Sequence, residues 1–441
     1  MAQKVLVLGA GLVAKPLVKY LLEVPEITIT LGDQFKAKAD ELIAGHSKGC
    51  SVEIDVNNEQ KLDGIVKDHD LTISLIPYIH HLKVASLCIK HKKPLVTASY
   101  VSPAMKALDK AAKDAGILFL NEIGLDPGID HMSAQQIIDQ VHKKGGAIES
   151  FKSICGGLPA PDANDNPFGY KFSWSPRGVV LAARNSARYL RDGRIVETPG
   201  KDLFLDVFEQ DVDGVGRLEV YPNRDSIPYS EIYSIPETKT MFRGTFRNLG
   251  WCKTWKLIAD MNYLDENPRH VKGRSFKDLT AEVAGVNVDR VRENIAKKFK
   301  LDPASDIFER LSWLGLFSDE VLPAENSSAL DLLVAKLQTK MEYKPGERDM
   351  VVLVHDFIAS YPKEKKRERI TSTLLDFGIP HGDSAMSRTV SLPAAIATKL
   401  ILEGKIRDKG VKIPVEPTIY EPVLKELAKL KISCNEKVTE M

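Results

Sequence analysis

The sequence predicts an α/β protein with a doubly wound parallel sheet, followed by a second α/β domain that has a mixed sheet and a helical insertion. Three observations predict this class. A strand-like run breaks at glycines directly before a helix-like segment; strands and helices then alternate to about residue 128; and the alternation is lost beyond residue 129. Because alternating strands and helices form βαβ units, the first part should bind ligands at the carboxyl ends of parallel strands.

The first strand and helix carry a glycine motif with the spacing G-x-G-x-x-A, within residues 4–14. Gly9 permits the tight turn, Gly11 lets backbone N–H groups approach a pyrophosphate, and Ala14 lets the helix pack closely on the strand. The helix N-terminus also faces the anion with its positive dipole end. The motif therefore predicts a Rossmann-like dinucleotide site, with a glycine-rich turn in a non-binding α/β fold as the alternative.

An acidic residue, Asp33, follows the second predicted strand at 27–31. An acidic residue about 20 positions past the glycine motif binds the ribose hydroxyls and repels a 2′-phosphate. We therefore expect NAD as the cofactor and consider NADP less favoured, although Lys36 and Lys38 keep that choice open. The alternative for Asp33 is a turn-forming residue at the end of a strand.

The alternation continues with strands at 51–56, 71–77, 94–98 and 117–121 and helices at 13–24, 59–67, 80–91 and 103–115. The carboxyl ends of parallel strands meet at one edge of a sheet, so the residues that follow these strands should surround one crevice. They are Asp55, Val56, Ile76, Pro77, Tyr78, Ser99, Tyr100, Leu125, Asp126 and Pro127. The pair His80-His81 opens a helix, and we interpret it as a solvated cap rather than a metal site.

Beyond residue 129 the strand-like runs are separated by long connections, which indicates a mixed or antiparallel sheet. A chain of 441 residues is long enough for two or three domains. The expected division is a dinucleotide-binding domain over 1–128, to which 384–441 return; a substrate-binding α/β domain over 129–250 and 345–383; and a helical domain over 251–344.

Two arginines lie on one face of a predicted strand at 238–247. Side chains alternate along a strand, so Arg243, Thr245 and Arg247 point the same way. Two neighbouring guanidinium groups repel each other unless an anion or an acidic side chain lies between them. Together with Arg224 they predict a substrate with several carboxylates, and structural salt bridges are the alternative.

The composition excludes several partners. Lys+Arg number 61 and Asp+Glu 60, a net charge of +1, so we expect a small-molecule substrate, no nucleic acid and no membrane, and we keep a homodimer open. The five cysteines are scattered without metal-ligand spacing, which predicts no metal site and a reducing compartment. We recognise no signal peptide and no apolar run of membrane-spanning length, so we expect a cytoplasmic protein.

Long motifs over nearly the whole chain resemble those of the glutamate-forming saccharopine dehydrogenases, also called saccharopine reductases. They lie at 74–78 (SLIPY), 97–100 (TASY), 124–131 (GLDPGIDH), 155–161 (CGGLPAP), 170–175 (YKFSWS), 221–226 (YPNRDS), 242–247 (FRGTFR), 347–350 (ERDM) and 384–390 (SAMSRTV). The resemblance implies a nucleotide domain, a substrate α/β domain and a helical insertion. It also implies an enzyme of lysine metabolism that oxidises the secondary amine of L-saccharopine to L-glutamate and L-2-aminoadipate 6-semialdehyde.

The resemblance assigns site residues motif by motif. The cofactor side would be Gly9, Gly11, Leu12, Val13, Asp55, Val56, Ile76, Leu125, Asp126, Pro127 and Ser175. The substrate side would be Ser99, Tyr100, Asp126, Arg224, Thr245, Phe246 and Arg247. The fungal NADP-using members carry an arginine after the second strand, where this chain has Gln34. In this the chain resembles the NAD-using animal members, which again favours NAD.

Three side chains are candidates for catalysis of that reaction. The secondary amine must be neutral before it releases a hydride, so a base is needed. Asp126 could accept or orient protons, Tyr100 could polarise the amine or the attacking water, and Cys155 could share in proton transfer. The alternatives are that Asp126 caps a helix beginning near Ile129 and that Cys155 is a buried structural thiol.

Two other functions stay open. A reductase of a related imine, such as a carboxylated polyamine precursor, would meet fewer carboxylates and would leave one arginine without a partner. A non-catalytic NAD-binding scaffold would need none of Ser99, Tyr100, Asp126, Arg224 and Arg247.

Overall fold

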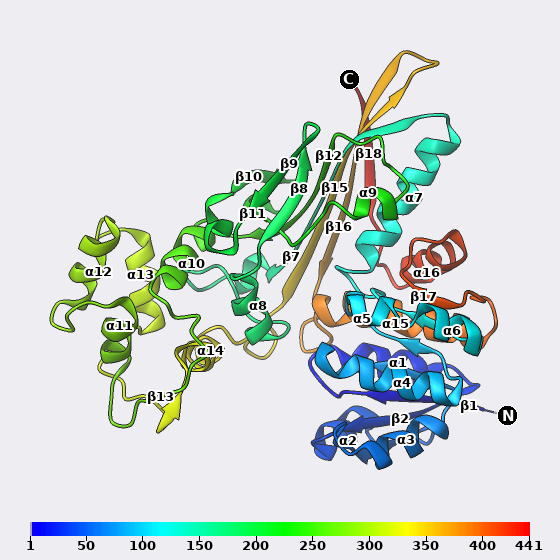
Figure 1. Cartoon of the computed structure of the whole chain (residues 1–441), viewed down its shortest axis with the longest axis horizontal. Helices are drawn as coiled ribbons and strands as arrows, with labels where there is room; N and C mark the ends of the chain where they lie inside the picture. The colour runs from blue at the N-terminus through cyan, green and yellow to red at the C-terminus, as the bar shows by residue number, and fades with distance from the viewer. Residues whose placement is uncertain (1) are drawn as a thin grey trace. The chain divides into compact units, whose positions relative to one another are not determined.

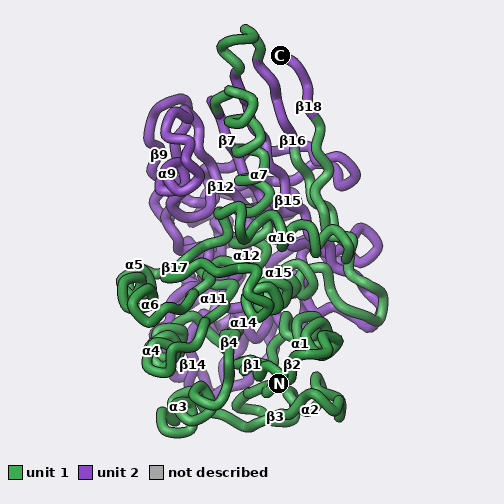
Figure 2. The backbone as a smooth tube through the Cα atoms, turned by 90° about the vertical axis from the view of Figure 1, so that its right-hand side faces the viewer, with its two compact units in different colours: residues 1–147, 361–366, 372–437 green, residues 148–360, 367–371, 438–441 purple. Residues whose placement is uncertain are grey.

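The structure is a computed structural model that describes residues 2–441. Its contacts divide the chain into two compact units, which Figure 2 colours separately. Unit 1 consists of residues 1–147, 361–366 and 372–437, and unit 2 of residues 148–360, 367–371 and 438–441.

Unit 1 is built on a seven-stranded sheet with the order β17-β6-β5-β4-β1-β2-β3 (Figure 1). All its neighbouring strands are parallel, which confirms the predicted doubly wound parallel sheet. The chain runs outward from β1 on one side and from β4 on the other, so the order reverses between these two strands. Ligands of such sheets bind outside the carboxyl ends of the strands at this reversal.

The strands of this sheet are short, and helices precede or follow them along the chain. The strands are β1 Gln3–Leu8, β2 Ile27–Asp33, β3 Gly49–Glu53, β4 Leu71–Ser74, β5 Leu95–Val96, β6 Leu118–Leu120 and β17 Gly410–Lys412. The helices are α1 Ala14–Glu23, α2 Lys36–Ile43, α3 Glu59–Lys67, α4 His81–His91, α5 Pro103–Lys106, α6 Asp109–Ala115, α7 Ile129–Lys143, α15 Ala385–Leu402 and α16 Pro417–Lys429.

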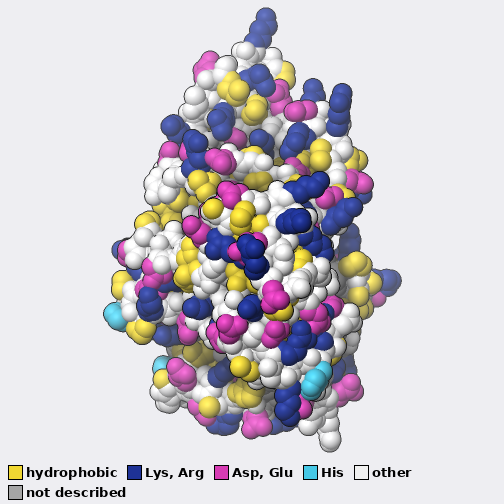
Figure 3. All heavy atoms as spheres, turned by 90° about the vertical axis from the view of Figure 1, so that its left-hand side faces the viewer, with side chains coloured by type: hydrophobic (Ala, Val, Ile, Leu, Met, Phe, Trp, Pro, Cys, Tyr) yellow, Lys and Arg dark blue, Asp and Glu magenta, His cyan; other side chains and the backbone are white. Residues whose placement is uncertain are grey.

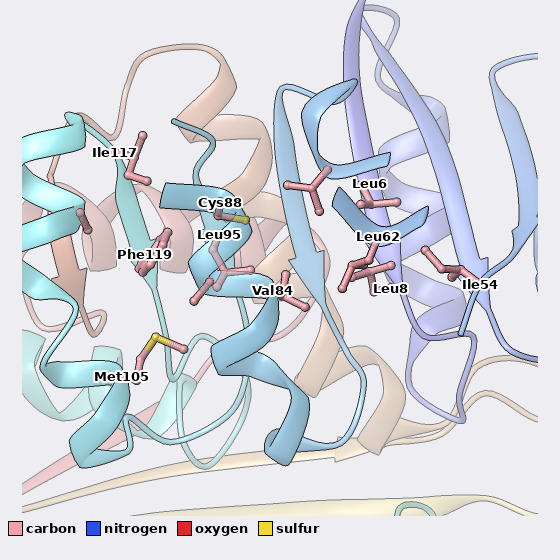
Figure 4. Packing of buried hydrophobic residues seen from close by; sticks show 13 residues of the cluster. Leu6, Leu8, Ile54, Leu62, Val84, Cys88, Leu95, Met105, Ile117 and Phe119 are labelled. Carbon is pink, nitrogen blue, oxygen red and sulfur yellow. The ribbon is translucent and has the colours of Figure 1, made fainter. Parts of the chain in front are cut away.

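Apolar side chains on one face of this sheet form a buried cluster with the helices that cover it (Figure 4). Leu8 from β1 and Phe119 from β6 are fully buried together with Leu62 from α3 and Val84 from α4. Burial of each such side chain contributes about 1.5–3 kcal/mol. This core fixes the strands and therefore fixes the loops at their carboxyl ends.

The second sheet is mixed, as predicted. Its order is β10-β11-β12-β7-β15-β16-β18, and β8 pairs with both β12 and β9. The pair β12–β7 is parallel, whereas β10–β11 and β11–β12 are antiparallel. The strands are β7 Ala147–Pro159, β8 Ala187–Arg191, β9 Arg194–Thr198, β10 Phe208–Val212, β11 Gly216–Pro222, β12 Thr240–Arg247, β15 Asp349–Tyr361, β16 Lys366–Phe377 and β18 Asn435–Glu440.

Helices dominate the rest of unit 2. They are α8 Pro176–Ala182, α9 Tyr229–Ile232, α10 Trp251–Asp260, α11 Phe276–Ala284, α12 Val291–Phe299, α13 Asp306–Leu314 and α14 Ala329–Lys340. The short strands β13 Arg269–His270 and β14 Asn326–Ser327 form a two-stranded sheet among them.

Charges of both signs are mixed on the face that Figure 3 shows. No helix within residues 2–441 is long and apolar enough to span a bilayer.

Candidate active site

The glycine motif forms the turn between β1 and α1 in unit 1. Gly9 has φ +106°, and a side chain there would bring its Cβ within 3.1 Å of the Leu75 carbonyl group. Gly11 is exposed, and a Cβ at that position would meet no atom within 4 Å. The neighbouring Leu12 side chain is 67% exposed, which is unusual for leucine. The backbone at Gly11 is therefore open to a ligand, and the turn fits a dinucleotide pyrophosphate.

Asp33 lies at the end of β2 and uses both carboxylate oxygens within the chain. Oδ2 accepts from the backbone N–H of Ala10 at 2.8 Å, and Oδ1 accepts from that of Phe35 at 2.8 Å. The carboxylate thus ties the glycine turn to the loop that follows β2. An acidic residue at this position therefore has a structural reason within the chain, whichever cofactor binds.

Most of the other predicted cofactor residues lie at the same edge of unit 1. Asp55 follows β3 and accepts the N–H of Asn57 at 2.8 Å. Val13, Val56 and Ile76 are half-buried, whereas Leu125 and Pro127 are buried. Ser175 is the exception, because it belongs to unit 2, where its hydroxyl caps α8 by accepting from Gly178 N at 3.2 Å.

Tyr100 and Asp126 come from different loops and meet in unit 1. The Tyr100 hydroxyl donates to Asp126 Oδ1 at 3.0 Å, and both side chains are half-buried. The N-cap of α7 is Gly128, and Asp130 Oδ1, not Asp126, accepts its N–H at 2.6 Å. A phenol that donates to a carboxylate is an arrangement that can pass or hold a proton at a substrate.

The prediction of a solvated cap is wrong for His81, because its side chain is buried with 4% exposure. Its Nδ1 lies 2.8 Å from Ser74 Oγ, and its Nε2 lies 2.8 Å from Ser99 Oγ. Burial lowers the pKa of His81 from 6.5 to about 4, so the imidazole is neutral near pH 7. A sequence signal for these hydrogen bonds exists. Ser74 ends one strand and Ser99 follows the adjacent one, and His81 begins the helix between them.

In unit 2 the β12 face predicted to carry two arginines contains a buried cation in an aromatic cage. Arg247 is 4% exposed, and its guanidinium carbon lies 5.1 Å, 5.8 Å and 5.3 Å from the ring centroids of Tyr170, Tyr221 and Trp251. Its Nη1 donates to the carbonyl of Phe246 at 2.8 Å, and its Nε has no partner. Across residues 2–441 no carboxylate forms an ion pair with it, and aromatic rings surround its positive charge instead.

The other predicted residues of unit 2 surround this strand. Thr245 is half-buried and lies opposite Cys155 of β7 in the register, while Phe246 is fully buried on the opposite face of β12. Cys155 is buried with 7% exposure. Arg224 is exposed in the loop after β11 and has a left-handed backbone with φ +57°. Such strained backbones cluster at functional sites.

Comparison with known proteins identifies relatives along nearly the whole chain. Residues 5–120 match the family model of the saccharopine dehydrogenase NADP binding domain, and residues 124–432 match the saccharopine dehydrogenase C-terminal domain. The saccharopine dehydrogenase [NADP(+), L-glutamate-forming] of Schizosaccharomyces pombe is 42% identical, over 99% of both chains. The mitochondrial alpha-aminoadipic semialdehyde synthase of Bos taurus is 40% identical over 96% of this chain but only 46% of its own length.

A solved structure covers the whole chain. The apo saccharopine dehydrogenase (L-Glu forming) of Saccharomyces cerevisiae superposes with a TM-score of 0.90 at 40% identity, over 99% of this chain and 100% of the yeast chain.

These relatives overturn the predicted cofactor. The fungal enzymes are named for NADP(+), as is the family model over residues 5–120, so the expectation of NAD with NADP less favoured is wrong. Asp33 has a role within the chain that is independent of the cofactor, because its carboxylate accepts the backbone N–H groups of Ala10 and Phe35. Family models cover most of the chain and full-length relatives share about two-fifths of its residues: the chain belongs to the saccharopine dehydrogenase family.

Proposed function

We propose that the chain oxidises the secondary amine of L-saccharopine with NADP+ and yields L-glutamate and L-2-aminoadipate 6-semialdehyde, as an enzyme of lysine metabolism. The observation that carries this proposal is the 42% identity, over 99% of both chains, to a fungal enzyme named for that reaction. The chemistry of the residues in each unit supports it.

NADP+ fits the glycine turn and, when bound, supplies the hydride acceptor. Gly9, Gly11, Leu12 and Val13 would hold its pyrophosphate, because the backbone there is open and leads into the N-terminus of α1. Asp55, Val56, Ile76, Leu125, Asp126, Pro127 and Ser175 would complete the cofactor side.

Arg247 is proposed to bind a substrate carboxylate. Its guanidinium is buried among aromatic rings without a counter-ion in the described residues, so a carboxylate would remove an electrostatic penalty that the free protein carries. A guanidinium also presents two parallel donors that match a carboxylate. The family motifs would add Arg224, Thr245, Phe246 and Ser99 to the residues that contact the substrate.

Asp126 and Tyr100 are proposed to handle the protons. Asp126 would take the proton from the substrate ammonium group, so that the nitrogen lone pair can form a C=N bond while the adjacent carbon loses a hydride. The resulting imine adds water, and the C–N bond then breaks to give the aldehyde and the amine of glutamate. Tyr100 donates to Asp126 Oδ1 at 3.0 Å, which orients the carboxylate and allows the phenol to polarise the attacking water. Cys155 is a further candidate for proton transfer.

The test is an absorbance assay at the band of the reduced nicotinamide, with purified protein, saccharopine and NADP+, followed by chromatographic detection of glutamate. We expect saccharopine-dependent reduction and one glutamate per reduced cofactor. The Arg247→Met variant serves as the control for contaminating activity. Two results would contradict the proposal. One is reduction of NADP+ without release of glutamate. The other is no reduction of NADP+ with saccharopine but turnover of a carboxylated imine.

A further inference from the structure

Glu122 holds the peptide segment of Tyr100 on both sides. Its backbone N–H donates to the carbonyl of Ser99 at 3.1 Å, and its side-chain Oε1 accepts from the N–H of Val101 at 2.9 Å. One residue therefore fixes the peptide groups before and after Tyr100. This contact pattern lies wholly within unit 1.

The second carboxylate oxygen of Glu122 continues to the loop of Asp126. Oε2 accepts from His131 Nε2 at 2.8 Å, and His131 Nδ1 lies 3.7 Å from Asp130 Oδ2. Asp130 Oδ1 accepts from Gly128 N at 2.6 Å, and its backbone N–H donates to the carbonyl of Leu125 at 3.0 Å. The contacts thus bracket Asp126 as well. They close a ring through the Tyr100–Asp126 hydrogen bond of 3.0 Å.

Fold stability alone does not account for this ring. Glu122 is 5% exposed, and His131 and Asp130 are fully buried. Apolar side chains of similar volume are often as stable as a buried ionic network, or more so. Glu122 also has a left-handed backbone with φ +56°, which disfavours any residue other than glycine. Burial of charge and backbone strain at one residue next to a reactive pair indicate a positioning role.

We propose that Glu122, held by His131, is a positioning residue that sets the distance and orientation of the Tyr100 hydroxyl relative to Asp126. The inference rests on the proposed function, because it assigns a purpose to the Tyr100–Asp126 pair. Glu122 itself does not act on the substrate. Its loss should let the segment 99–101 shift, and a displacement of about 1 Å at a reacting group lowers the rate about 10²-fold.

The first experiment separates positioning from a structural role by steady-state kinetics. Glu122→Ala should lower kcat about 10²-fold while the KM values for saccharopine and NADP+ change little. Glu122→Gln keeps an oxygen for the Val101 N–H, so it should lose much less activity. The matched control is His69→Gln, since His69 is also buried in unit 1, with 6% exposure and hydrogen bonds to Ile65 and Thr30. That variant should keep the kcat of the parent protein.

The double variant decides whether Glu122 acts through Tyr100. In the Tyr100→Phe background, Glu122→Ala should lower kcat by less than about threefold, because the group that it positions is gone. An equal loss in both backgrounds would overturn the proposal, since a general structural defect is independent of Tyr100.

A measurement that needs no substrate separates this inference from the proposed function. With 13Cζ-labelled tyrosine, the resonance lost in Tyr100→Phe identifies Tyr100, and its chemical shift reports the hydrogen bond to Asp126. We expect this shift to change in Glu122→Ala, to change less in Glu122→Gln and to stay in His69→Gln. An unchanged shift in both Glu122 variants overturns the inference. Absence of saccharopine turnover by the parent protein overturns the proposed function instead. If Glu122→Ala does not fold, Glu122→Gln carries both measurements.

Discussion

Two buried cations of unit 2 have opposite surroundings. Lys171 is 2% exposed, and its Nζ lies 2.8 Å from Asp165 Oδ1 and 2.6 Å from Glu347 Oε2. Arg247 is 4% exposed and is surrounded by aromatic rings, without a carboxylate partner in the part of the chain that the structure describes. A buried charge is stable when its partners are complete. The charge of Lys171 is therefore compensated by acidic partners, whereas the charge of Arg247 has no acidic partner among the described residues.

The difference shows that residue type alone does not separate a structural charge from a functional one. Lys171 belongs to the same motif, 170–175, that supplies the ring of Tyr170 to the Arg247 cage. The set of partners distinguishes the two cations, and that set is formed by segments far apart in the chain.

Replacing Arg247 should have the largest effect on activity. Arg247→Met removes the cation that we assign to the substrate carboxylate, so kcat/KM for saccharopine should fall by about 10²–10³-fold. The free energy of unfolding should stay equal or rise, because an uncompensated buried charge is lost. Steady-state kinetics and urea denaturation measure the two quantities. Arg247→Lys should rescue only partly, since an ammonium group lacks the two-donor fork. If Arg247→Met markedly lowered the free energy of unfolding but left the kinetics unchanged, Arg247 would be a structural residue like Lys171.

Replacing Lys171 should reverse this pattern. Lys171→Met leaves Asp165 and Glu347 without their buried partner, so the free energy of unfolding should fall by about 3 kcal/mol. The kcat of the folded fraction should be retained. Lys344 contacts the same two carboxylates at 2.7 Å and 3.8 Å but is 70% exposed, so Lys344→Met is the matched control and should have little effect. If Lys171→Met and Lys344→Met lowered the free energy of unfolding equally, burial would not explain the importance of the Lys171 ion pairs.

A third buried group becomes an uncompensated cation only when it is protonated. The pKa of His81 is about 4 in the folded chain, compared with 6.5, because burial disfavours the charged ring. Its contribution to stability is therefore complete above pH 6.5 and is lost as the pH falls toward 4. The loss should be on the order of 3 kcal/mol over this window. Urea denaturation of the parent and of His81→Gln at a series of pH values gives the difference. If the free energy of unfolding had the same pH dependence in the parent and in His81→Gln, His81 would not be a buried neutral ring.

The strands β1 to β6 of the first sheet could be predicted from the sequence because their signals are local, whereas β17 was not predicted. The glycine motif and the alternation of apolar runs give β1, the turn at Gly9 and the succession of parallel strands within short windows. The strands β8, β9 and β10 were not predicted. Residues 194–198 of β9 are mostly exposed, so they carry no apolar alternation that marks a strand. Their pairing is determined by neighbours in the sheet.

The sequence names candidate site residues, but it does not give the contacts that these residues make. The motifs include Tyr100, Asp126 and Arg247, whereas the structure adds what each one contacts. The hydrogen bond from Ala10 N–H to Asp33, 23 positions away, is one such contact. The contact between Glu122 and His131 likewise joins groups whose pairing no spacing rule gives. Long-range contacts of this kind depend on the packed fold.

Two exposed lysines of unit 1 differ in the same way as Lys171 and Arg247, since one has an acidic partner and the other has none among the described residues. We expect the smallest effect on activity from these two residues. Lys36 pairs with Asp40 at 2.6 Å, four residues along α2. Lys38 is exposed, its Nζ lies 5.2 Å from the centroid of the Phe35 ring, and no carboxylate pairs with it among residues 2–441. By the same argument we expect Lys38, rather than Lys36, to be available to the 2′-phosphate of NADP+.

Lys38→Ala should therefore raise the KM for NADP+ roughly twofold to fivefold, because an exposed and hydrated lysine contributes only weakly. The KM for NAD+, which lacks the phosphate, should not change, and the salt dependence of NADP+ binding should become shallower, since one charge contact is lost. Lys36→Ala is the matched control and should change neither KM, because Asp40 already neutralises that ammonium group. Steady-state titrations with both cofactors at two ionic strengths measure these differences. An equal rise of the KM for NADP+ in Lys36→Ala and Lys38→Ala would contradict this prediction. The presence or absence of an ion-pair partner would then not separate a ligand-binding lysine from a structural one at the surface. The distinction drawn between Lys171 and Arg247 would hold only for buried residues.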